Sequence, residues 1–277
     1  MTDLALRVQE ELIQAIDKDQ LVLPTLPEVA LRIREAAEDP DISISELAKQ
    51  ISTDAALSAR LIKVVNSPLL RSRQEITDLN MAVNRMGVVY TANLPTGLAM
   101  AQLFQATTDV IDQKMREVWA RSTEVAGISH VLCKHYTRLK SDQATLAGLV
   151  HQIGVLPILS YAEDNSQLLR DSASLDQVIE RIHPILGDRI LAAWDFPQPL
   201  RHIPSQHLEF TRNPDTVDYA DVVQVAMLQS LEGSNHPFAQ TDWANISSFS
   251  RLGLNPADNQ DEEDLSAEME AAMLLLG

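Results

Sequence analysis

The feature that most restricts the fold of this chain is a long apolar stripe with the period of an α-helix. The stripe comprises Met115, Val118, Trp119, Ser122, Val125, Ala126, Ser129 and Leu132, which recur at spacings of three and four residues. Residues at these spacings share one face of a helix, and the apolar–polar alternation of a half-buried strand is hard to find in the chain. We therefore expect an all-α protein in which this helix is a core element of the second half.

Caps and breakers predict shorter helices before this stripe. Ser43 and Glu46 have the spacing of a capping box for a helix that runs to Ile51. Thr53-Asp54 supplies the next N-cap, and the helix that follows is expected to stop at 66–68, because the residue before a proline is pushed out of the α region.

Further helices are expected along the rest of the chain. Thr77 is expected to cap a helix that ends at Gly87. The apolar segment 88–104 should be helical, with a kink or a delayed start at Pro95. Beyond the central stripe, helices are predicted around Gln143–Val155, Leu175–Ile182, Leu186–Trp194 and Val217–Leu231.

These segments suggest two helical subdomains and a tail. We place the first subdomain at about 1–108 and the second at 109–254, since the pattern breaks between Thr107 and Asp112. The last part, 255–277, begins with an acidic linker and then carries an amphipathic stripe, which is expected to dock on this chain or on a partner. The stripe consists of Leu265, Met269, Ala272, Met273 and Leu276.

Composition excludes several classes of protein. The formal net charge of −17 repels nucleic-acid phosphates, so general nucleic-acid binding is not expected. Cys133 is the only cysteine, which fits a reducing compartment and a small buried side chain. The first twenty residues lack a signal-peptide pattern, and no uninterrupted run of about 18 apolar residues occurs, so we expect a cytoplasmic protein without a membrane span.

Histidines are the main candidates for chemistry. His151, His183, His202 and His207 could bind a metal or transfer a proton, but their spacing alone is a weak signal. His151 could equally be a core-edge residue bonded to backbone, and His183, which precedes Pro184, could organise a helix start. Calcium-loop, glycine-rich phosphate-loop and Gly-x-Ser-x-Gly patterns are not found.

The order of several short motifs resembles the HDOD domain, a relative of the HD phosphohydrolases found in bacterial signalling proteins. The resemblance covers about residues 20–235 and implies an all-α fold of the HDOD or HD-like type. The motifs lie at 23–27, 51–57, 61–67, 76–87, 118–122, 147–154 and 183–187.

The resemblance also implies that a metal site is degenerate in this chain. Catalytic relatives such as the HD-GYP phosphodiesterases have an early His, a His-Asp pair, later His residues and a final Asp. Here the matching positions carry Arg121 for the early His, Gln152 for the Asp after His151, and Met227 for the final Asp. Val155 takes the place of a lysine.

Three neutral ligands at most remain by this comparison. They are His151, His183 and His207, the last in a Gln206-His207 pair where two histidines are often found. Without a bridging carboxylate, and with the cation of Arg121 in the same cavity, two-metal hydrolysis is not expected.

Our leading hypothesis is a non-catalytic signalling module without a cofactor. It would bind a signalling protein, and Arg121 with His183 could hold a small anionic or nucleotide ligand. The alternative is a phosphohydrolase that uses Fe, Mn or Zn on the three histidines and on one further carboxylate. A third hypothesis is a structural protein that forms a homodimer through its carboxyl-terminal helix. The carboxylates considered for the metal are Asp188, Asp218 and Asp221.

Overall fold

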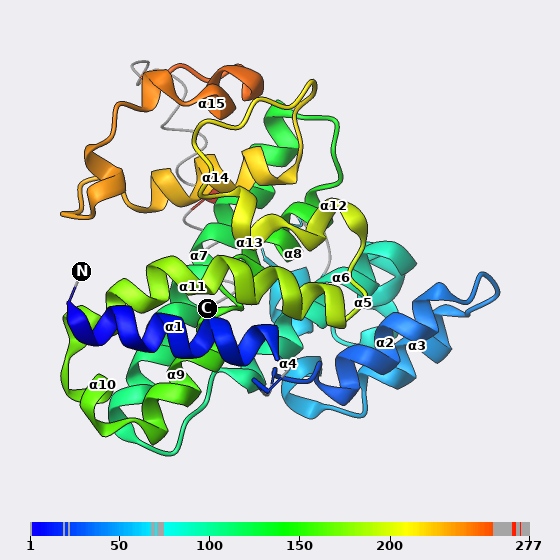
Figure 1. The fold of residues 1–277 in the computed structure, drawn as a ribbon. Coiled ribbons are helices and arrows are strands. Elements are labelled where there is room, and N and C mark those ends of the chain that lie inside the picture. Colours follow the sequence, from blue (N-terminus) through cyan, green and yellow to red (C-terminus); the bar gives the residue numbers. More distant parts are fainter. Residues whose placement is uncertain are drawn as a thin grey trace.

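The fold is seen in a computed structural model that describes residues 2–18, 20–21, 23–67, 70, 75–256, 268–269 and 272. No strand occurs in these residues, and the all-α class is confirmed (Figure 1). Three 3-10 helices are η1 (Met100–Leu103), η2 (Pro237–Gln240) and η3 (Trp243–Asn245). The α-helices are α1 (Asp3–Asp17), α2 (Glu28–Glu38), α3 (Ile44–Ile51), α4 (Ala55–Val65), α5 (Leu79–Met86), α6 (Val88–Ala99), α7 (Asp109–Tyr136), α8 (Ser141–Val150), α9 (Val155–Asp164), α10 (Ser166–Arg170), α11 (Ser172–Ala193), α12 (Gln198–Arg201), α13 (Ile203–Gln206), α14 (Tyr219–Ser230) and α15 (Ser247–Leu252).

Local capping signals correctly predicted the starts of α3 and α4. Ser43 and Glu46 form both bonds of the capping box before α3, and the Asp54 carboxylate caps α4. The cap of α5 is Asp78 and not Thr77, so that prediction is off by one residue. An aspartate competes well for this position because its carboxylate accepts a bond from the helix amides and favours the positive end of the helix dipole.

Two helices continue through prolines, at Pro95, where we expected a kink or a delayed start, and at Pro184, where we expected two separate helices. α6 begins at Val88 and runs through Pro95, so the delayed start is wrong. α11 runs through Pro184, so the two separate helices predicted there are one. Buried side chains on both sides of Pro184 belong to the same core, and their packing outweighs a proline cost of about 3 kcal/mol. These side chains are Leu175, Val178, Ile182, Leu186, Ile190 and Leu191.

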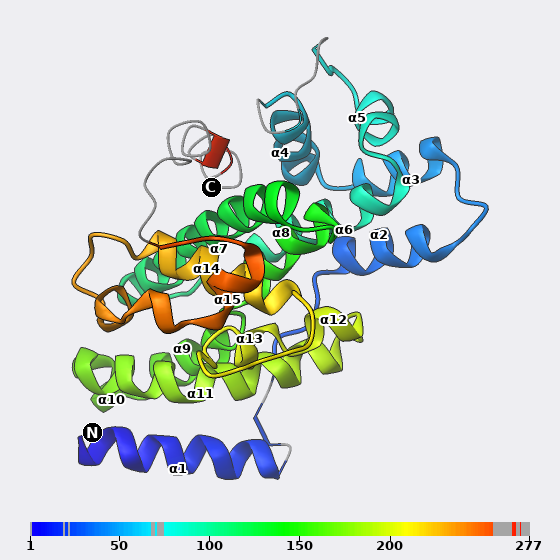
Figure 2. The ribbon, with the colours of Figure 1, turned by 90° about the horizontal axis from the view of Figure 1, so that it is seen from above.

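Buried apolar side chains form two main groups. The smaller group is built mostly by α2–α6, and Figure 2 shows α2–α5 as a lobe on one side of the molecule. The larger group contains the helices from α7 onward and also α1, which lies along α11 in Figures 1 and 2. The packing therefore divides the chain differently from a boundary at residue 108, because α1 shares the core of the second half.

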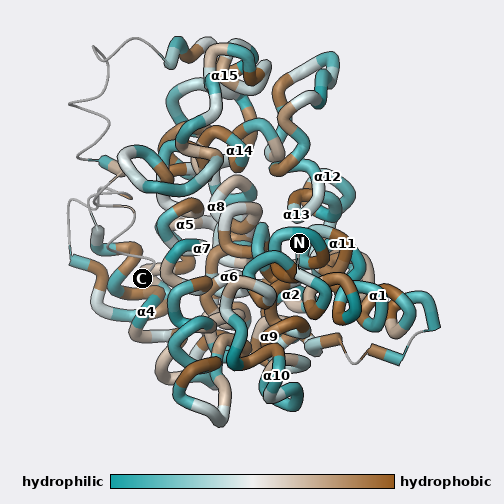
Figure 3. The backbone as a smooth tube through the Cα atoms, turned by 60° about the vertical axis from the view of Figure 1, so that its left-hand side comes forward, coloured by the Kyte–Doolittle hydropathy of each residue, from teal (hydrophilic) through white to brown (hydrophobic). Residues whose placement is uncertain are grey.

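The two groups meet where α6, α7 and α8 cross. Leu149 of α8 and Ala126 of α7 both pack with the smaller core. Gly148 lies so close to α7 that a Cβ there would come 2.4 Å from the Cα of Ala126. Figure 3 shows polar and apolar residues mixed along most helices, as expected for helices that bury one face.

Residues Ser141–Asp164 are long and apolar enough to cross a membrane by length and composition alone. In the fold they form α8 and α9, which are joined by a turn, and 83% of the most apolar window is buried inside the molecule. Packing in the core accounts for their apolar character.

Replacing Gly148 by Ala tests the contact between α7 and α8. We expect Gly148→Ala to lower the free energy of unfolding by about 1–3 kcal/mol, since the new methyl meets backbone atoms that cannot rotate away. Gly97→Ala is the matched control, because its methyl would meet the end of the Leu149 side chain, which can move. Urea unfolding should show a loss below about 1 kcal/mol for the control. Equal losses would contradict a backbone contact.

Candidate functional site

Three histidines that are distant in the sequence meet inside the larger core. His151 follows α8, His183 lies in the middle of α11, and His207 follows α13. The ring centroids of His151 and His207 are 5.0 Å apart, and those of His183 and His207 are 6.2 Å apart. All three side chains are buried, with relative exposures of 0%, 5% and 1% respectively. His183 is thus not at a helix start, and the three rings form a cluster that we call the histidine cluster.

Glycines allow the elements that carry this cluster to touch. A Cβ on Gly154 would lie 1.9 Å from the carbonyl oxygen of His183 and 2.5 Å from the amide nitrogen of Gly187. A Cβ on Gly187 would lie 2.4 Å from the ring of Pro204, just before His207. The turn after α8 therefore lies directly on α11, and α11 lies directly on α13.

Each imidazole of the cluster is fixed in one tautomer by the backbone. A carbonyl oxygen only accepts hydrogen bonds, so each Nδ1 donates its proton and each Nε2 carries a lone pair. The Nε2 atoms of His151 and His183 are buried and have no hydrogen-bond partner in the part of the chain that is described. The accepting carbonyls belong to Gly148, Ile179 and Ile203, at 2.6, 2.7 and 2.9 Å.

Burial keeps these histidines neutral. Desolvation lowers the pKa of His151 and of His183 to about 4, in each case against the hydrogen bond from Nδ1 to the backbone. The pKa of His207 falls well below its usual value, first because of desolvation and then because of its two histidine neighbours. The cluster therefore presents acceptor atoms to its interior at neutral pH.

Arg121 lies on α7 with an exposed side chain. Its charge helps to lower the pKa of His151, after burial and after the neighbouring His183, so the guanidinium acts on the cluster through space. It also opposes the desolvation that raises the pKa of Glu124. Within the described residues, no hydrogen bond or ion pair engages the Arg121 guanidinium.

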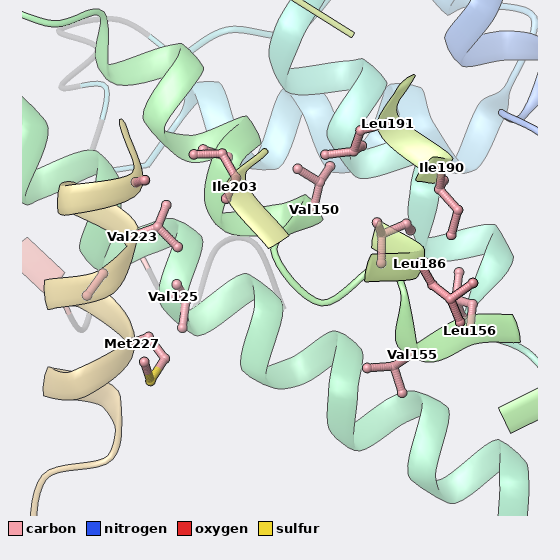
Figure 4. Close-up of a cluster of buried hydrophobic side chains, with 14 of the residues drawn as sticks. Val125, Val150, Val155, Leu156, Leu186, Ile190, Leu191, Ile203, Val223 and Met227 are labelled. Atoms are coloured by element: carbon pink, nitrogen blue, oxygen red, sulfur yellow. The ribbon is translucent and has the colours of Figure 1, made fainter. Parts of the chain in front are cut away.

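The remaining predicted site residues, Gln152, Gln206 and Met227, have different surroundings. Gln152 follows His151 and has a buried Oε1 atom without a partner among the described residues. Gln206 is half-buried at the end of α13. Met227 is buried among apolar side chains, and Figure 4 labels it with Val125 and Val223 in one such cluster. A methionine in this position offers no oxygen ligand.

Asp188, the first carboxylate considered as a further ligand, is bonded elsewhere. Its oxygens accept hydrogen bonds from the amide and hydroxyl of Ser205, at 3.1 and 2.7 Å, and lie 2.9 Å from Nδ1 of His202. These bonds join α11 to the segment before His207.

Asp218 and Asp221 belong to a second polar network. Asp221 is fully buried, and its carboxylate accepts bonds from Arg212 at 2.6 Å and from Arg251 at 2.7 and 2.9 Å. Asp218 caps α14 and pairs with Arg212. Both carboxylates are therefore neutralised by arginines of the same chain.

The donor set of the described residues does not fit a hard divalent cation. Among the described residues, no group of three or more His, Cys, Asp or Glu side chains is placed to hold one. The histidine cluster offers only neutral nitrogen acceptors, while the three carboxylates are engaged in bonds that stabilise the fold. Hard divalent cations need oxygen ligands and negative charge, which this arrangement does not supply.

Sequence reasoning missed the residues that connect this second network to the cluster. Gln224 donates to the carbonyl oxygen of His207 at 2.9 Å and accepts from Ser248, which also donates to Asp221. The spacing of Asp218 and Asp221 is a capping-box signal that marks the start of α14. Nothing in the sequence spacing indicates the partners from α15, because those contacts form only in the folded chain.

The fold and the histidine cluster define an all-α protein of the HD-like type. The family model described as the HDOD domain matches residues 23–210, and the chain belongs to this family. This confirms the family resemblance seen in the sequence motifs.

Solved structures with the same fold extend over nearly the whole chain. A protein of Shewanella amazonensis, provisionally named a metal-dependent phosphohydrolase, is 29% identical, with each chain covered completely and a TM-score of 0.90. An HDOD domain protein of unknown function from Geobacter sulfurreducens is 20% identical, with 98% and 96% of the two chains covered and a TM-score of 0.62. A protein of Marinobacter aquaeolei, provisionally named a signal transduction protein, is 19% identical over 99% of this chain and 66% of its own, with a TM-score of 0.65.

An uncharacterized protein of Treponema pallidum is 26% identical over 248 residues. The match covers 82% of this chain but 46% of that protein, so the chain spans about half the length of this relative.

Acid should destabilise the protein in part through the histidine cluster. In the unfolded chain a histidine has a pKa near 6.5, but in the fold His183 has a pKa of about 4. Between these two pKa values the unfolded chain binds more protons than the folded chain. The free energy of unfolding therefore falls as the pH falls through this window, and the full stability is present above it. Urea unfolding from pH 7 to 4.5 should be less pH-dependent in His183→Gln, by about 1 kcal/mol per pH unit. An unchanged slope would contradict the burial of a neutral imidazole.

Removing the Asp221 carboxylate should unfold the protein more easily. Asp221→Ala leaves two arginines without their buried partner, so we expect a loss of about 3–5 kcal/mol in the free energy of unfolding. Asp242→Ala is a control, since this aspartate caps a short exposed helix, and it should cost about 1 kcal/mol. Guanidinium unfolding of both variants measures the difference. A loss for Asp221→Ala no larger than the control would show that the network adds little stability.

Proposed function

We propose that this chain is a non-catalytic signal-transduction module of the HDOD family that acts by binding a signalling protein. The observation that supports the proposal is that, in the part of the chain that the structure describes, the carboxylates considered as ligands are not available to the histidine cluster. The candidates Asp188, Asp218 and Asp221 are all held by other groups of the fold. Without a carboxylate, the cluster lacks the oxygen ligands that hold hard divalent cations and lacks a carboxylate base for an attacking water.

A small anionic or nucleotide ligand is a narrower form of the same proposal. The Nε2 lone pairs of the cluster would repel an anion, since two acceptors cannot share a hydrogen bond. The group suited to an anion is the exposed Arg121, whose guanidinium can donate two parallel bonds to a phosphate or carboxylate. Such a ligand would therefore bind at Arg121 outside the cluster.

Metal-dependent phosphohydrolase activity is the alternative function. The observation that favours it is the likeness over the full length to the Shewanella amazonensis protein with that provisional name. In this alternative, His151, His183 and His207 would be the ligands, after a rearrangement that frees a carboxylate.

Measurements of metal content and of phosphodiester hydrolysis distinguish the non-catalytic module from the phosphohydrolase. We expect tag-free protein, purified without chelator, to contain far less than one equivalent of Fe, Mn or Zn by elemental analysis. With Mn²⁺, Fe²⁺ or Zn²⁺ added, its rate on bis(p-nitrophenyl) phosphate should equal that of the His207→Ala variant. This variant removes one cluster nitrogen and serves as the background for contaminating activity.

Two results together would contradict the non-catalytic proposal. Near one equivalent of metal, together with a rate that is lost in both His207→Ala and His151→Gln, would overturn the non-catalytic proposal. Circular dichroism of the two variants confirms that a lost rate does not come from unfolding.

A further inference from the structure

The described part of the carboxyl-terminal segment lies on the end of α7. Residues 268, 269 and 272 are helical, and the Glu268 carboxylate pairs with Nζ of Lys134 and, at 2.9 Å, with Nε2 of His135. Ala272 is fully buried against Val131, and Met269 packs beside them. The expected docking of the tail on its own chain is seen for these residues, while Leu265, Met273 and Leu276 of the predicted stripe lie outside the described residues.

The described part of this contact is separate from the main cores. Its buried apolar members, Val131 and Ala272, form a group of their own. The Lys134 and His135 side chains each remain 38% exposed, so the ion pair of Lys134 and the hydrogen bond of His135 with Glu268 are partly open to water. Exposed ion pairs contribute little to stability, so a competitor that makes the same contacts could displace these residues.

The charges of the two surfaces are complementary. The chain from Lys134 to Lys140 also carries His135 and Arg138 and contains no acid, in a protein with a net charge of −17. Residues 257–277 carry seven acidic residues and neither lysine nor arginine. Cations at the end of α7 are favoured by the helix dipole, and they provide the attraction for an acidic helix.

We propose that the face formed by Val131, Lys134 and His135 is a receptor surface for an acidic amphipathic helix of a partner protein, and that the carboxyl-terminal segment of this chain is its resident occupant. The matching helix carries a Glu that reaches Lys134 and His135, and a small apolar residue four positions later that covers Val131, as Glu268 and Ala272 do here. The inference goes beyond the proposed function by naming the surface and the chemistry of the partner.

A peptide in trans tests the receptor surface in the full-length chain. The probe is a fluorescent synthetic peptide with the sequence of residues 264–277. The receptor is the double variant Glu268→Lys/Ala272→Asp, in which the resident segment has lost its ion pair and its apolar contact. Fluorescence anisotropy should show that this variant binds the peptide at least tenfold more tightly than the wild type, because a tethered segment competes at an effective concentration of about a millimolar.

Two matched changes connect the binding to the proposed contacts. A peptide with the Glu268→Lys change should not bind the receptor variant. When Lys134→Glu is added to the receptor variant, the unchanged peptide should no longer bind. The peptide with Glu268→Lys should bind this receptor, because the charges of the pair are exchanged. Equal affinity of wild type and variant would overturn the proposal that the segment occupies this face. Failure of a folded variant to bind the peptide would overturn the receptor surface itself.

The oligomeric state shows whether the segment on this face comes from the same chain or from a second copy. Light scattering should give a monomer mass for the wild type and for the double variant. A dimer that dissociates in the double variant would overturn occupation by the same chain, because the segments would then be exchanged between copies. None of these readouts depends on metal content or hydrolysis, so either proposal can fail alone.

Discussion

Backbone-to-backbone contact between helices at glycine is the constraint on which the rest of this structure depends. Gly148 brings α8 against Ala126 of α7, and Gly154 brings the next turn against α11 at His183. A side chain at either position would separate the helices by roughly the size of a methyl group. Since His151 lies between these two glycines, the same contacts that close the core also place the histidine beside its neighbours.

Local signals could be predicted from the sequence, whereas signals that depend on distant contacts could not. The capping box at Ser43 and the stop after Val65 were correct because neighbouring residues decide them. Pro184 was misjudged, since the packing of α11 along its whole length outweighs the local preference for a break. The packing of α1 with the second half was missed for a similar reason, because its buried face does not indicate which core it joins.

In the candidate site, too, local signals could be predicted from the sequence and distant contacts could not. The family motifs identified His151, His183 and His207, but their spacing contained no information on distance, and only the fold brings their rings together. The carboxylate network could not be foreseen either, because Arg212 and Arg251 reach Asp221 from segments that meet only after folding. Through Gln224 this network also holds the carbonyl of His207, so the acidic residues near the cluster support its position.

The apolar surroundings of Met227 have a consequence for how this chain could change over generations. An aspartate introduced there alone would be a charge without a partner among buried valines, at a cost of several kcal/mol. A carboxylate in place of Gln152 would put a charge where the Oε1 atom of Gln152 is already buried without a partner among the described residues. Each of these single substitutions therefore lowers stability, because it buries a charge without a partner. Carboxylates could be accommodated at these two positions without that cost only together with a cation or a basic side chain that pairs with them.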